Sequence, residues 1–169
     1  MLCRRLADLE VVREAEPPGQ SRYRSALWRI WDPARAPALF VGLNPSAADD
    51  ERDDHTVCCC VRLAQEWGCG GVLVGNLFAL RATDPADLRG VADRVGPEND
   101  EWLARLARDA GVLVAAWGAA HQDPTRERTV LDALRATGRP VECLGTTACG
   151  APRHPSRLRA GTGRASFAA

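Results

Sequence analysis

The chain has 169 residues, 46% hydrophobic and 26% charged, which is enough for one domain with a sizeable core. No apolar stretch approaches the ~20 residues that cross a membrane, so no membrane-spanning segment is expected. The formal net charge is zero and all 22 basic residues are arginine, so any phosphate contact would use guanidinium groups gathered on one face.

The cellular setting is predicted from the first residues and the cysteines. Residues 1–16 carry charges throughout and predict no export signal. Seven cysteines, an odd number, favour a reducing cytoplasm. Cys58, Cys59 and Cys60 are adjacent, and consecutive helical positions face different directions. They are interpreted as small buried hydrophobes, with a metal site the less favoured alternative, so no metal or cofactor is expected.

Apolar runs and helix-like runs alternate along the chain. After a strand or hairpin arm at 23–32, buried strands are predicted at 38–43, 70–80, 112–118 and 140–145, and helices at 56–68, 98–111 and 124–138. This order predicts an α/β fold, a three-layer sandwich with a central, mostly parallel sheet of about four core strands and helices on both faces. One domain is predicted over 1–160, followed by a flexible tail at 161–169.

Four loops follow the predicted strands, and ligands bind beyond the carboxyl ends of strands in such sheets. They are Gly-Leu-Asn-Pro-Ser at 42–46, the segment 75–85, Trp-Gly-Ala-Ala-His at 117–121 and the segment 145–158. Asn44 either caps its strand end through an Asx turn or presents an amide to a ligand. Asn76 interrupts a buried strand, so it is either a hydrogen-bonded core amide or a reader of a base edge.

The last loop contains Arg-His-Pro-Ser-Arg-Leu at 153–158, which places a histidine, a hydroxyl, two arginines and a leucine together. Arginine is dense after residue 150, and acid is dense in Asp-Asp-Glu-Arg-Asp-Asp at 49–54. The basic stretch is either a DNA-facing rim or a solvated tail.

Taken in order, these loops resemble the motifs of the uracil-DNA glycosylase superfamily. Residues 42–46 are similar to the Gly-Ile-Asn-Pro-Gly motif of the mismatch-specific uracil/thymine branch. Residues 74–85 resemble the strand whose Asn reads the pyrimidine, and 154–158 resemble His-Pro-Ser-Pro-Leu. The chain also resembles an uncharacterised bacterial domain family with Asn-Pro-Ser near its start and His-Pro near its end.

The superfamily resemblance implies a role for each matching residue. Asn44 would position the attacking water and His154 would donate toward the pyrimidine O2. The remaining base contacts would come from Gly42, Leu43, Ser46, His55 and Asn76. The DNA contacts would come from Arg153, Ser156, Arg157, Leu158 and Arg159, with Leu158 as the wedge that fills the vacated stack. It further implies a monomer that acts on double-stranded DNA with a flipped pyrimidine.

Three departures from the superfamily pattern refine the expectation. The fastest members have Asp at the position of Asn44, so slow turnover is predicted because an amide is a very poor base. They have Tyr at the position of Ser46, where the ring excludes a 5-methyl group. A small residue there predicts a 5-substituted pyrimidine, including hypermodified cytosine of phage DNA. Where the superfamily stacks an aromatic on the base, this chain has His55 or Thr56, and His55 is the candidate for this contact.

Two other functions remain open on the sequence. One is a nucleoside or nucleotide hydrolase on the same fold, which would have no use for Leu158 as a wedge. The other is a non-catalytic module that binds DNA lesions, which Asn44 allows because it replaces the carboxylate. The acidic run at 49–54 would repel phosphate, so it either faces away from the DNA or contacts sugar hydroxyls of an unusual base.

Overall fold

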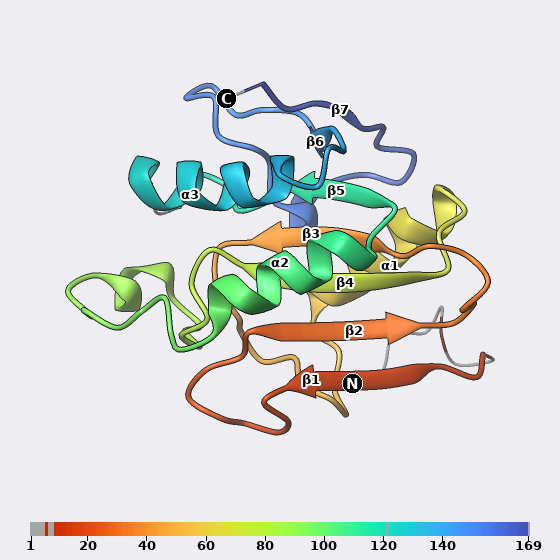
Figure 1. Cartoon of the computed structure of the whole chain (residues 1–169), viewed down its shortest axis with the longest axis horizontal. Helices are drawn as coiled ribbons and strands as arrows, with labels where there is room; N and C mark the ends of the chain where they lie inside the picture. The colour runs from red at the N-terminus through yellow and green to blue at the C-terminus, as the bar shows by residue number, and fades with distance from the viewer. Residues whose placement is uncertain (1–5, 7–8, 121, 169) are drawn as a thin grey trace.

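The computed structural model describes residues 6, 9–120 and 122–168, with no account of the side chain of residue 157. Within this part of the chain, seven strands form one sheet in the order β1-β2-β4-β3-β5-β6-β7 (Figure 1). The strands are β1 (Val12–Glu16), β2 (Ala26–Ile30), β3 (Ala38–Gly42), β4 (Gly71–Asn76), β5 (Val112–Ala115), β6 (Val141–Cys143) and β7 (Ala165–Ser166).

The sheet is mixed in strand direction. The central pairs β3–β4, β3–β5 and β5–β6 are parallel. The outer pairs β1–β2, β2–β4 and β6–β7 are antiparallel. The predicted α/β class is confirmed, but the sheet has more strands than the four of the predicted core. Strand β1 was not predicted because its Val-Arg-Glu-Ala-Glu sequence lacks the apolar run of a central strand.

Three α-helices lie in the described residues, α1 (His55–Glu66), α2 (Asn99–Asp109) and α3 (Pro124–Arg135). Figure 1 shows α2 and α3 in front of the sheet and α1 behind it. Asp54 caps α1 by accepting from the Val57 N–H, and Asp123 caps α3 by accepting from the Arg126 N–H. None of these helices is long and apolar enough to cross a membrane.

Strand alternation divides the core between the two faces of the sheet. Leu39 and Val41 of β3 pack in the cluster that contains the apolar residues of α2 and α3. Ala38 and Phe40 pack in the cluster that contains those of α1. Because both faces of the central strands are covered, their sequences are apolar without polar alternation.

The end of the chain closes the sheet beside β6. Residues 165–166 form β7, and Phe167 packs edge-on against Trp117 with the ring centroids 5.9 Å apart. The exposed fraction of Phe167 is 7%. These residues fall in the segment 161–169 for which the sequence predicted a flexible tail, and residue 169 lies outside the described residues. This stretch contacts the domain through the β6–β7 pairing, the Phe167 N–H bonded to the Val141 carbonyl and the Phe167 ring.

The parallel strands bring the predicted loops to one edge of the sheet. Backbone hydrogen bonds join the loops after β3 and β4, from the Leu77 N–H to the Gly42 carbonyl and from the Ala82 N–H to the Pro45 carbonyl. The Gly118 N–H donates to the Pro152 carbonyl, which ties the loop after β5 to the segment before His154.

Candidate functional site

A cavity of about 660 Å³ lies at the carboxyl ends of β3, β4 and β5. Its volume falls in the ~300–1,000 Å³ range of small-ligand pockets. The predicted site residues that line it are Gly42, Leu43, Asn44, Ser46, Asn76, Arg153, His154, Ser156 and Leu158. Segments more than 100 residues apart in the sequence therefore share one cavity.

Two hydrogen bonds hold the side-chain amide of Asn44 in one orientation. The Nδ2 group donates to the carbonyl of Pro45 at 3.0 Å and to the carbonyl of Ala82 at 2.7 Å. Two carbonyl acceptors require the NH2 group on that side, so the oxygen Oδ1 occupies the other side. The hydrogen bonds of Asn44 are thus made by its NH2 group, whereas in an Asx turn the side-chain oxygen would accept, and Oδ1 is left as an acceptor in a residue that lines the cavity.

Asn76 ends β4 with 3% of its surface exposed, and its Nδ2 has no hydrogen-bond partner among the described residues. Its Oδ1 lies 2.8 Å from the position that a Cβ at Gly42 would occupy. Gly42 is therefore needed because a side chain there would displace the Asn76 amide. An unpartnered buried donor is costly, by about 1–3 kcal/mol, which is typical of a group that pairs with a ligand.

Hydrogen bonds also define which ring nitrogen of His154 is the acceptor. Its Nδ1 accepts the Ser156 N–H at 3.3 Å and lies 2.8 Å from the Ser156 Oγ. Because a backbone N–H can only donate, Nδ1 is the acceptor and the neutral ring carries its proton on Nε2. The positive φ of Gly118, and the 3.3 Å between its would-be Cβ and that of His154, show that the loop after β5 passes close beside the histidine.

The other predicted site residues lie around the cavity rather than in it. The imidazole Nε2 of His55, the first residue of α1, lies 3.0 Å from the Ser156 carbonyl, and His55 does not line the cavity. Arg159 is exposed and does not line the cavity. The backbone of Arg157 ends the 3-10 turn η3 (Pro155–Arg157), and its side chain lies outside the described part.

Leu158 lines the cavity and is half-buried against the apolar cluster under α1. Its carbonyl accepts a hydrogen bond from the Arg62 Nη2 at 3.2 Å. The side chain is thus packed on the protein, and a role as a wedge in DNA would require it to move. Arg153 is exposed and donates from Nε to the Thr146 carbonyl at 3.1 Å.

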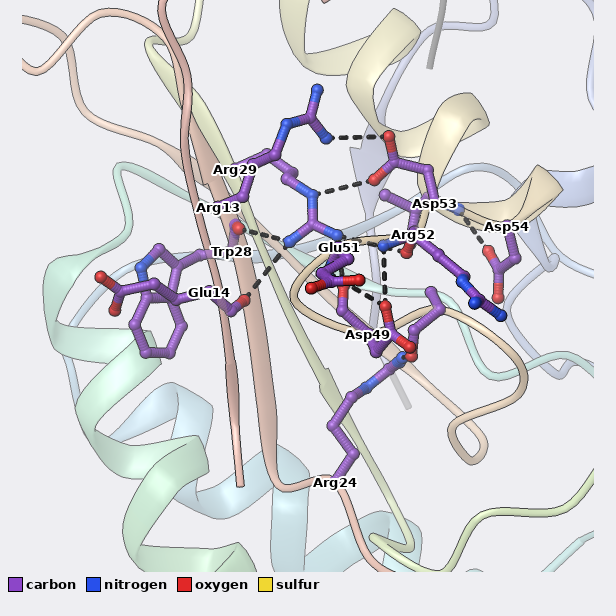
Figure 2. Close-up of polar contacts among 12 residues, drawn as sticks. Arg13, Glu14, Arg24, Trp28, Arg29, Asp49, Glu51, Arg52, Asp53 and Asp54 are labelled. Atoms are coloured by element: carbon purple, nitrogen blue, oxygen red, sulfur yellow. Dashed lines mark hydrogen bonds and ion pairs between the residues drawn. The ribbon is translucent and has the colours of Figure 1, made fainter. Parts of the chain in front are cut away.

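The acidic run at 49–54 folds around an arginine. Figure 2 shows Asp53 between two arginines, with its oxygens 2.8 Å from the Arg29 Nε and 3.0 Å from the Arg13 Nη1. The side chains of Arg29 and Asp53 are fully buried. Arg29 also donates to the backbone carbonyls of Trp28, Glu14, Arg52 and Asp49.

Asp49 and Asp50 accept hydrogen bonds from the loop that contains Gly19 and Gln20. Burial raises the pKa of Asp49, but hydrogen bonds from the Gln20 side chain and from the N–H groups of Arg52 and Glu51 outweigh burial and lower it overall. Asp50 accepts the Gly19 N–H at 2.8 Å. Most of the acidic run therefore serves the fold, and only Asp54 lines the cavity.

Arg24 lines the cavity although sequence reasoning did not single it out. Asp54 and Trp117 also line it, and the sequence had placed them only within the acidic run and the loop at 117–121. Arg24 is 3% exposed and donates from Nη1 to the Ala48 carbonyl, while its Nε has no partner among the described residues. Burial, and then the nearby Arg81, lower the pKa of Arg24 to about 10. No sequence signal marked it, because an arginine just before a strand is usually exposed.

The described cysteines and acids do not gather into a metal site. No group of three or more His, Cys, Asp or Glu residues in the described chain could hold a metal ion. Cys59 and Cys60 are buried in α1, and burial raises the pKa of Cys60 well above its ordinary value. Cys60 borders the cavity as part of its apolar wall. His121, in the loop after β5, lies outside the described residues.

Comparisons with known proteins give a family for the chain. Residues 22–156, well over half of the chain, match the family described as "Protein of unknown function (DUF1643)". The match runs from just before β2 to Ser156 and so includes the loops that form the cavity. No curated protein and no solved structure matches.

Proposed function

We propose that this chain, which belongs to the DUF1643 family, is a DNA glycosylase that flips a modified or mismatched pyrimidine and hydrolyses its N-glycosidic bond. The observation that carries the proposal is the pair Asn44 and His154, each fixed by hydrogen bonds in the lining of one cavity that is also lined by Asn76. The motifs that resemble the uracil-DNA glycosylase superfamily supply these three residues.

In the proposed reaction, Asn44 Oδ1 accepts a hydrogen bond from a water and aims its oxygen at the anomeric carbon. The water forms a new bond to that carbon as the bond to the base nitrogen breaks, and the bonding electrons leave with the base. The water gives up its proton to solvent, because an amide cannot accept it. The transition state has oxocarbenium character, as in sugar hydrolysis.

His154 acts on the departing base. With its proton on Nε2, the neutral ring donates toward the pyrimidine O2, where negative charge develops. Asn76 presents Nδ2 and Oδ1 to the Watson–Crick edge of the flipped base, which satisfies the unpartnered Nδ2. Turnover is slow because the site activates the leaving group more than the water.

The substrate carries a substituent at C5, because Ser46 leaves space where a larger side chain would close the cavity. A 5-substituted cytosine, including a hypermodified base of phage DNA, fits this space. Around the cavity mouth, Arg153, Ser156, Arg157 and Arg159 would contact phosphates, and Leu158 would leave its packed position to fill the vacated stack. The proposed protein is a cytoplasmic monomer that acts on double-stranded DNA.

The test is a panel of duplexes with uracil, thymine mispairs or 5-substituted cytosines, treated with alkali after incubation. Abasic sites break under alkali, so strand cleavage at the modified position is the expected result. The absence of cleavage on every duplex, from protein shown to be folded, would refute the proposal.

A second candidate is a nucleoside or nucleotide hydrolase, and the packed position of Leu158 favours it. The two are separated by Leu158→Ala, which lowers the activity of a DNA glycosylase and leaves that of a nucleoside enzyme unchanged. Turnover of free nucleosides without any abasic DNA product would select the second candidate. Salt-dependent DNA binding without a product would instead select a non-catalytic lesion-binding module.

A further inference from the structure

Arg24 and Arg81 form a pair of positive charges beside the cavity. The Nη1 atoms of both residues donate to the same acceptor, the Ala48 carbonyl. No carboxylate lies within ion-pair distance of either guanidinium in the part of the chain that the structure describes. Two like charges that share one carbonyl oxygen repel each other unless an anion joins them.

Arg24 is the member of the pair that belongs to the cavity. It lines the cavity, is 3% exposed and keeps its Nε without a partner among the described residues. Arg81 stays behind it, bound to the carbonyls of Ser46 and Gly19. Burial lowers the pKa of Arg24, and Asp54 and Asp49 oppose this from beyond ion-pair distance. Within the described chain, the buried guanidinium still keeps its Nε without a partner, which indicates a ligand with negative charge.

The same cavity contains other unpartnered donors. Asn76 Nδ2 and Trp117 Nε1 are buried without partners among the described residues, and both residues line the cavity. Asp54 is the single carboxylate of the cavity lining, and its side chain already accepts the Val57 N–H. In the described lining, two arginines, Arg24 and Arg153, stand against this one carboxylate, which favours an anionic ligand.

We propose that Arg24 forms an oxyanion subsite in the cavity, which binds a carboxylate or phosphate group of the ligand at the end near Ser46. The position follows from the chain, because Ala48 lies two residues after Ser46 and its carbonyl holds the guanidinium. The proposal rests on the proposed function for one point, namely that the ligand is a pyrimidine. The oxyanion is either a 5-carboxylate of the base or a DNA phosphate.

Calorimetric titration of the whole chain with uracil-5-carboxylate, the neutral uracil-5-carboxamide and inorganic phosphate tests the subsite. The carboxylate should bind about tenfold more tightly or more than the carboxamide, the difference expected for a charge-assisted hydrogen bond. Binding of inorganic phosphate that depends on Arg24, without preference for the carboxylate, would identify the oxyanion as a phosphate. A chain that binds neither anion would overturn the proposal.

Arg24→Met should remove the preference for the carboxylate over the carboxamide. Arg22→Met is the matched control and should keep this preference, because Arg22 is exposed over the Tyr23 ring. A preference that survives in Arg24→Met would also overturn the proposal. The melting temperature gives a second readout, since removal of an unpaired buried charge should leave the unliganded variant at least as stable as the wild type. A purely structural role for Arg24 predicts a large loss of stability instead.

If Arg24→Met does not fold, Arg24→Lys decides the question. Lysine keeps the charge but lacks the planar fork that reaches both Ala48 and a ligand, so the preference should fall several-fold. An unchanged preference in Arg24→Lys would contradict the subsite. If only the subsite is wrong, the protein still binds neutral pyrimidines and still produces abasic sites in DNA. If only the proposed function is wrong, the protein binds the oxyanion but produces no abasic sites in DNA.

Discussion

Two hydrogen bonds determine which side of the Asn44 amide carries the oxygen, although its oxygen and nitrogen have nearly the same shape. The carbonyls of Pro45 and Ala82 hold its NH2 group, so the acceptor is left for the ligand. The sequence predicted the position of Asn44 but left open whether it caps the turn or faces a ligand. In the structure the NH2 group donates to two carbonyls, no Asx turn through the side-chain oxygen is formed, and a ligand contact of that oxygen stays a prediction.

This environment predicts that Asn44→Asp will not create a faster enzyme. One carboxylate oxygen would replace Nδ2 and face both carbonyl oxygens, which raises the pKa of the new carboxyl and favours its protonated form. The rate of base release should fall about tenfold or more, and it should recover partly as the pH falls because the acid form can donate again. A pH–rate profile compared with Asn44→Ala measures this. A rate above that of the wild type at neutral pH would contradict the fixed orientation of Asn44.

Ser46 is predicted to set the substrate preference. A tyrosine at this position would fill the end of the cavity, so Ser46→Tyr should lower kcat/KM for 5-substituted pyrimidines about tenfold or more relative to uracil, since the larger group clashes with the ring. Ser46→Ala keeps the space and should leave the ratio unchanged. The ratio of kcat/KM for the two substrates is the measurement, and equal losses on both would contradict the assignment of Ser46 to C5.

The contacts of the acidic segment between β3 and α1 could not be predicted from the sequence. Six residues with five acids at 49–54 suggested a solvated or substrate-facing run. In the structure, Arg29 of the buried strand β2 forms an ion pair with Asp53 and donates hydrogen bonds to four backbone carbonyls. Charge pairing across 24 residues leaves no local periodicity, so a single sequence cannot reveal it.

The buried pair predicts a strong effect on stability. Asp53→Asn keeps the volume but leaves Arg29 as an uncompensated buried charge, so the free energy of unfolding should fall by about 3–5 kcal/mol. Asp32→Asn is the control, because the Asp32–Arg35 pair is exposed and should contribute less than ~1 kcal/mol. Chemical denaturation of both variants gives the comparison. Similar losses in the two would argue against the buried pair as the centre of this segment.

The strands and helices themselves were largely predictable, whereas parts of the cavity were not. Apolar runs located β3, β4 and β5, because both faces of these strands are covered. The loops after them supplied Asn44, Asn76 and His154. Arg24 was missed because its place in the lining depends on how the segment before β2 packs, which the chain's local pattern does not encode.

Over the whole molecule, the C-terminal stretch is coupled to the cavity through one aromatic pair. Phe167 packs on Trp117, and Trp117 lines the cavity. Phe167→Ala should lower the free energy of unfolding by about 3 kcal/mol and weaken ligand binding, because the Trp117 ring loses its support. Ser166→Ala, at an exposed position in β7, should change stability by less than ~0.5 kcal/mol. Unchanged stability in Phe167→Ala would show that the end of the chain is dispensable.

The central claim is that the cavity releases a base from DNA. The most direct measurement is a mass-spectrometric search for the free base after incubation of the protein with DNA that contains 5-substituted pyrimidines. The wild type should release the substituted base, and Asn44→Ala and His154→Ala should each release it about 10²-fold more slowly. No released base from any such DNA, or equal release by both variants, would contradict the account.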